Sequence, residues 1–178
     1  MHANMLYPEG FKMNDIQIGK GSISIWAIIA AIGAIFAFIS LFLGIFHEQM
    51  TVITTINGPS VSGLDLVSKK IDGHTVDSLT FWRFMPLFAA LLGLATLVLA
   101  ALPIFGVNNK GTKTAFLVCA VLTFIFGILV MFVTASGAVI DGNTDGIKFV
   151  KEVGAYFALI GGLLAALGAA LDFFGVKI

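Results

Sequence analysis

Charged residues are absent from the interiors of four long apolar segments, at residues 23–46, 84–105, 115–136 and 154–171. Each segment reaches the length of ~18 apolar residues that indicates a membrane-spanning helix. Pumps, transporters and membrane enzymes usually need ionisable groups at membrane depth, because these groups carry the ions or perform the chemistry. The missing charges therefore predict a membrane protein and argue against these functions.

Cysteine is nearly absent too, since Cys119 is the only one, and an intrachain disulfide is therefore excluded. No N-x-Ser/Thr glycosylation acceptor occurs, and we expect a prokaryotic cell membrane. The chain also lacks a nucleophile–base pattern, a Gly-rich phosphate loop and a redox pair, so we expect no enzyme activity. Ten basic and ten acidic residues cancel without a long basic run, which argues against nucleic acid as a partner.

Hydrophobic residues make up 58% of the 178 residues, which leaves room for one membrane domain over residues 1–178 and no separate soluble domain. The sequence predicts an all-α membrane protein, a left-handed bundle of four transmembrane helices. Two outer loops, residues 47–80 and 137–153, are expected to form a small extracytoplasmic cap. Thr, Val and Ile are frequent in residues 50–56, and an Asn-Gly-Pro turn follows, so the cap is expected to include a short strand.

Positive charge in the short connection between the second and third apolar segments sets the expected orientation. This connection contains Lys110 and Lys113 and no acidic residue, and such loops usually remain in the cytoplasm. Both termini are then cytoplasmic. Asp172, near the inner end of the fourth segment, is expected to meet water or these two lysines. Arg83, the only arginine, is expected at the outer mouth of the second segment, where it either pairs with a loop carboxylate or binds a lipid head group.

Small residues recur at spacings of three and four in all four segments, the heptad pattern of left-handed helix packing. The fourth segment has an additional row of small residues at a spacing of four. This face either contacts a second subunit or partner protein, or the helix lies between two helices of its own chain. The row consists of Gly154, Ala158, Gly162, Ala166 and Ala170.

The second outer loop contains the only metal-like constellation that the sequence offers. Asp141, Asn143 and Asp145 are followed by Gly146 and, six residues later, by Glu152. This spacing satisfies the calcium-loop pattern, in which oxygen ligands converge around a turn and a glutamate closes the site. The stretch resembles an EF-hand loop, although its eighth and ninth positions are lysine and phenylalanine. It predicts a calcium site, and the alternative is a polar connector built from turn-forming residues.

The long first outer loop, the short inner connection and the shorter second outer loop together resemble the claudin-type tetraspan arrangement. The claudin signature, a Trp-Gly-Leu-Trp stretch followed by paired cysteines, is absent: residues 62–66 read Ser-Gly-Leu-Asp-Leu. The resemblance thus implies a topology and no sealing activity. Residues 62–66 and 154–162 also resemble small uncharacterised prokaryotic four-span membrane proteins.

We expect a non-enzymatic protein of the lipid bilayer that acts through helix–helix and outer-loop contacts. It would be an accessory or assembly subunit of other membrane proteins, or a homo-oligomeric scaffold. The alternative is a channel or transport component whose pore forms between subunits. Its polar lining would come from hydroxyl groups on the same small-residue rows that packing would bury, those of Ser40, Thr96, Thr123 and Thr134.

Overall fold

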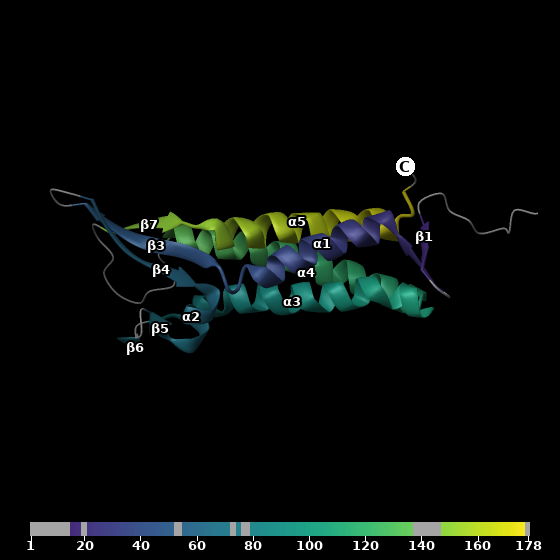
Figure 1. Cartoon of the computed structure of the whole chain (residues 1–178), viewed down its shortest axis with the longest axis horizontal. Helices are drawn as coiled ribbons and strands as arrows, with labels where there is room; N and C mark the ends of the chain where they lie inside the picture. The colour runs from purple at the N-terminus through teal and green to yellow at the C-terminus, as the bar shows by residue number, and fades with distance from the viewer. Residues whose placement is uncertain are drawn as a thin grey trace, which may run out of the picture.

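A computed structural model of the chain describes residues 15–18, 21–51, 55–71, 74–75, 79–136 and 147–176. Within these residues, long helices run side by side (Figure 1), and each packs mainly against two of the others. α1 and α4 both lie against α5 and against α3, so the four helices close a ring. The long helices are α1 (Ile25–Ile39), α3 (Met85–Ala101), α4 (Lys110–Ser136) and α5 (Val153–Phe173).

The expectation of an all-α protein is wrong, because the described residues also form three antiparallel sheets. Backbone N–H and C=O groups that lie beyond the helix ends need partners, and strand pairing supplies them. Shorter helical turns flank the bundle: α2 (Gly63–Ser68), η1 (Phe81–Phe84) and η2 (Leu102–Phe105). The sheets are β1 (Asp15–Ile18) with β2 (Gly21–Ser24); β4 (Thr55–Ser62), β3 (Gly44–Thr51) and β7 (Ile147–Lys151) in that order; and β5 (Lys70–Ile71) with β6 (His74–Thr75).

The three-stranded sheet, which we call the outer sheet, joins the two expected outer loops and projects beyond the helix ends (Figure 1). The Asn-Gly-Pro sequence was expected to be a turn, but it lies inside β4. The register between β3 and β4 shifts there, where His47 pairs with Ser60 but Gln49 pairs with Asn57. A bulge accommodates a proline that cannot donate a ladder hydrogen bond. The strand therefore continues through the expected turn.

The first apolar segment is not one helix over residues 23–46, as its composition predicted. α1 ends at Ile39, and β3 begins at Gly44. Ile45 and Phe46 are 0% and 2% exposed, because both belong to the buried cluster in which the base of the outer sheet meets α2, α3, α4 and α5. The apolar character of this stretch thus reflects the core of the cap. α1 has 15 residues and is about 22 Å long at ~1.5 Å per residue, shorter than the ~30 Å hydrocarbon core.

Three helices are long and apolar enough to cross a membrane: Phe81–Phe105, Lys110–Phe132 and Val153–Phe173. They agree with three of the expected segments, except that α4 begins at Lys110, before the expected start at residue 115. The chain is therefore a membrane protein, in which apolar helices carry a β-sheet cap at one end.

The first outer loop also contains a short helix whose start follows from its sequence. Within residues 62–71, the structure has α2 followed by β5. Ser62 and Asp65 form a capping box: the Ser62 hydroxyl accepts from Asp65 N at 3.2 Å, and Asp65 Oδ2 accepts from Ser62 N at 2.9 Å. These bonds satisfy amide groups that a helix start leaves unpaired.

Candidate contact sites at the two ends of the bundle

The small-residue face of α5 packs against the protein's own helices. A Cβ atom at Gly162 would lie 2.7 Å from Phe124 Cα, and one at Gly127 would lie 2.5 Å from the carbonyl oxygen of Ala158. The α4 and α5 backbones are therefore in direct contact. Gly154 is equally close to β3, because a Cβ there would lie 2.7 Å from the Gly44 carbonyl oxygen.

Of the five residues that the sequence offered to a partner, Gly154, Ala158 and Gly162 are buried by this packing, and Ala166 and Ala170 are half-buried. The second row of small residues on α5 contacts α1. A Cβ atom at Gly161 would lie 2.6 Å from Ala37 N, and one at Gly168 would lie 2.6 Å from Ala30 N. α5 thus lies between two helices of its own chain, the second of the two arrangements that the sequence allowed. The buried residues of both rows are therefore used for contacts within the chain.

At the outer end, Glu152 connects the strands of the outer sheet to the start of α5. Its Oε1 lies 2.9 Å from His47 Nδ1 on β3, and its Oε2 accepts a hydrogen bond from the Ser60 hydroxyl on β4. Its backbone N–H donates to the Ile45 carbonyl at 2.8 Å. Glu152 directly precedes α5 and follows β7, so its bonds fix all three strands relative to the bundle. Gly44 makes this possible, because a Cβ there would overlap both Glu152 Oε2 and Ser60 Oγ.

The predicted calcium ligands Asp141, Asn143 and Asp145 lie outside the described residues. The fourth ligand, Glu152, is described, and both of its carboxylate oxygens have the protein partners given above. A calcium ion that used this carboxylate would have to replace those hydrogen bonds. Calcium binding at residues 141–152 remains a prediction.

Arg83, on η1, stacks on a ring instead of pairing with a loop carboxylate in the described part of the chain. Its Cζ lies 4.5 Å from the centroid of the Phe84 ring, a cation–π contact. Its Nη1 is buried and has no hydrogen-bond partner among the described residues. Glu152, one of the partners considered for it, is bonded to His47 and Ser60 instead.

The tip of the outer sheet exposes apolar side chains. Met50 on β3 and Ile56 on β4 are direct cross-strand partners, and they are 46% and 62% exposed. Directly opposite residues project from the same face of a sheet. Phe46, four residues before Met50 on the same strand, also lies on this face and is buried beneath the sheet. This face of the outer sheet is therefore buried against the bundle at the base of the sheet and exposed at its tip.

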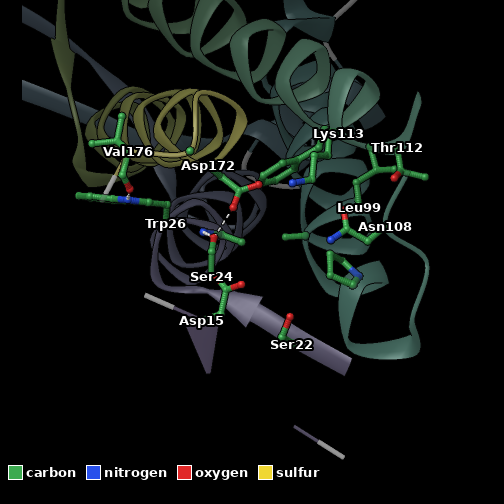
Figure 2. Close-up of a pocket in the computed structure, with 15 residues that line it drawn as sticks. Asp15, Ser22, Ser24, Trp26, Leu99, Asn108, Thr112, Lys113, Asp172 and Val176 are labelled. Carbon is green, nitrogen blue, oxygen red and sulfur yellow. Dashed lines mark hydrogen bonds between the residues drawn. The ribbon is translucent and has the colours of Figure 1, made fainter. Parts of the chain in front are cut away.

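At the opposite end of the bundle lies a cavity of about 300 Å³ to which all four long helices contribute. The β1–β2 hairpin also lines it through Asp15 and Ser22. Figure 2 shows Ser24 bonded to Asp172, and Lys113 reaching toward Asp172 across the cavity. Sequence reasoning missed this inner cavity, because the polar residues that line it come from distant parts of the chain.

Two hydrogen bonds beside the inner cavity join the start of α1 to the end of α5 and the residues that follow it. The Ser24 hydroxyl caps α1 by accepting from Ala27 N at 3.0 Å, and it donates to Asp172 Oδ1. The Trp26 indole N–H donates to the Val176 carbonyl at 2.8 Å. Asp172 was expected to meet water or a lysine, but its described partner is this serine. The start of α1 is thereby fastened to the end of α5.

These features define the class of the protein: a membrane protein with a helical core, an outer sheet at one end and a polar cavity at the other. No model of a known protein family matches the chain, and no curated protein matches it. The function must therefore be argued from the geometry alone.

Proposed function

We propose that the protein is a non-enzymatic scaffold or assembly subunit of a membrane complex, and that it contacts its partner through the tip of the outer sheet. The observation that carries this proposal is the exposed apolar pair Met50 and Ile56, on the face of the sheet that packs on the bundle at its base. A water-exposed apolar surface beside the membrane is typical of a protein contact site.

The sheet is a suitable contact surface because its strands are held in place before a partner binds. The bonds of Glu152 to His47 and Ser60 fix β3 and β4, and β7 leads directly into α5. A surface that is already ordered loses less conformational entropy on binding. The membrane helices, by contrast, use their small-residue rows for packing within the chain. The faces that they present to lipid or protein carry larger side chains.

We infer that both ends of the chain lie at the cytoplasmic face of a prokaryotic membrane. The start of α1 and the end of α5 lie together, joined by the bond from Trp26 to Val176. The same end contains Lys110 and Lys113, and positive residues favour the cytoplasmic side. The outer sheet would then be extracytoplasmic.

The proposal predicts a crosslink from the sheet tip. Ile56→Cys in a Cys119→Ala background has one thiol, which a short bismaleimide can join to a neighbour in native membranes. We expect an adduct with a second copy or with another membrane protein, and either result supports contact at the sheet. The matched control is Phe105→Cys, at the opposite end and 78% exposed, which should give several-fold less adduct. Equal adduct from both positions, or none from Ile56→Cys, would contradict the proposal.

The inter-subunit pore receives no support from the described hydroxyl groups. Ser40, Thr96 and Thr123 are each 0% exposed. Each donates to a carbonyl of its own helix: Ser40 to Ala37 at 2.6 Å, Thr96 to Leu92 at 2.8 Å and Thr123 to Cys119 at 2.8 Å. The side chain of the fourth candidate, Thr134, lies outside the described set. We therefore do not propose a pore between subunits.

A further inference from the structure

We propose that the inner cavity binds a zwitterion that combines a primary ammonium with a phosphate, the chemistry of an ethanolamine phospholipid head group. Its volume of about 300 Å³ lies at the lower end of the range of ligand sites, ~300–1,000 Å³. A head group fits this size, whereas a whole lipid does not. The inference is independent of the contact proposed for the outer sheet.

The charges of the cavity favour a ligand that carries both signs. Asp15, Asp172 and Lys113 line it, and no ion pair joins these three residues to any other described residue. Asp172 accepts a hydrogen bond from Ser24, which leaves its other oxygen for a ligand. The two carboxylates can accept hydrogen bonds from an ammonium group, and the Lys113 ammonium can donate to an anion, so the lining has partners for both ends of a zwitterion.

The donors and acceptors of the cavity also select the type of amine. A primary ammonium donates up to three hydrogen bonds, the number that a lysine side chain offers, and carboxylate oxygens can accept them. A choline group has no N–H to donate, so it would leave the two carboxylates unpaired. An anionic head group without an amine would meet two carboxylates against one lysine, a net repulsion.

The position of the cavity matches the level of lipid head groups. It lies at the ends of the apolar helices, and Trp26 forms part of its wall. Tryptophan is enriched where the hydrocarbon core meets the head groups. The ammonium would lie beside Asp15 and Asp172, and the phosphate beside Lys113. The same chemistry could also come from a soluble phosphoethanolamine compound.

Trp26 provides a direct measurement of binding. Trp82→Phe leaves Trp26 as the only tryptophan, because the chain has two. In mild detergent, we expect its fluorescence to change saturably with short-chain phosphatidylethanolamine. Binding of the matching phosphatidylcholine and phosphatidylglycerol should be at least tenfold weaker. O-phosphoethanolamine identifies the source: equal affinity for it indicates a soluble ligand, and weak binding indicates a lipid head group.

Variants of the charged residues test the assignment. Asp172→Asn keeps an acceptor for Ser24 and should weaken binding about tenfold, as should Asp15→Asn and Lys113→Met. The matched controls are Lys110→Met, at the same helix end but outside the cavity lining, and Glu48→Gln on the outer sheet. Both should bind as the parent does. The three cavity variants lie on three different elements, which keeps the test valid if one of them fails to fold. The inference is overturned if Trp26 shows no saturable response, if the three lipids bind equally, or if the cavity variants bind as the controls do.

Discussion

The two ends of the helical bundle both contain carboxylates and exposed apolar side chains, but their carboxylates have different partners. At the outer end, the carboxylate of Glu152 is bonded to His47 and Ser60, and apolar side chains are left exposed beyond it. At the inner end, Phe105 and Phe174 are exposed as well, but a cavity with polar residues lies there, and Asp15 and Lys113 remain without an ion pair in the described residues. This difference is the basis of our two proposals, a protein contact at the outer end and a zwitterionic ligand at the inner end.

The largest expected effect comes from closing the space that Glu152 occupies. In Gly44→Ala, the new Cβ would overlap Glu152 Oε2 and Ser60 Oγ, so the hydrogen bond between these two side chains must break. Both overlapping atoms are ends of side chains that can rotate away, so the cost is that of the hydrogen bonds they lose, about 1.5–3 kcal/mol in the free energy of unfolding. Thermal unfolding in detergent, with hydrogen exchange to locate the change, measures it.

The matched control for this substitution lies in the same sheet. At Gly58, a Cβ would meet its nearest neighbour, the Glu48 carbonyl oxygen, at an ordinary 3.4 Å. Gly58→Ala should therefore change stability by less than about 0.5 kcal/mol. An equal loss from both variants would show that the position of Glu152 does not depend on the space at Gly44.

A smaller effect is expected at the inner end from Ser24→Ala. This change removes the cap of α1 and the donor to Asp172 together. Loss of a serine N-cap costs about 1 kcal/mol. Hydrogen exchange should increase in the first turn of α1 and leave the outer sheet unchanged. Faster exchange at both ends would contradict the independence of the two regions.

The smallest expected effect concerns calcium at the outer end. If residues 141–152 bind calcium, the ion must compete with His47 and Ser60 for Glu152, and a weak site of about 10⁻⁴–10⁻³ M is expected. Isothermal titration should detect heat that is lost in Asp141→Ala and kept in Asp65→Ala, a change at an acidic residue outside this loop. The absence of calcium-dependent heat in the parent protein would refute the site.

The sequence predicted three of its four membrane-length helices correctly, because long runs without charge are compatible with little else. It failed at residues 41–46, since composition cannot distinguish apolar residues that face lipid from residues such as Phe46 that fill the core of a cap. The outer sheet was underestimated for a related reason. One of its two strand pairings, β3 with β7, spans a sequence separation of about a hundred residues, as His47 with Val150 shows, and local propensity contains no such information.

The two candidate sites also differ in how much of each could be predicted from local sequence. Glu152 was recognised by its spacing within one loop, whereas its bonds to His47 and Ser60 depend on the fold. The pairing of Ser24 with Asp172 spans 148 residues, and each residue alone looks like a polar group at a helix end. The small-residue row of α5 was visible, but only the packing against α4 shows which surface it contacts.

The size of the complex in mild detergent tests the central claim most directly. Light scattering of the purified protein should give a mass above that of one 18.8 kDa chain. The double variant Met50→Ser, Ile56→Ser should reduce it to a single chain or release a co-purified subunit, while Leu91→Ser on the exposed side of α3 should not. An unchanged mass for the double variant would contradict the account of the outer sheet as the contact surface.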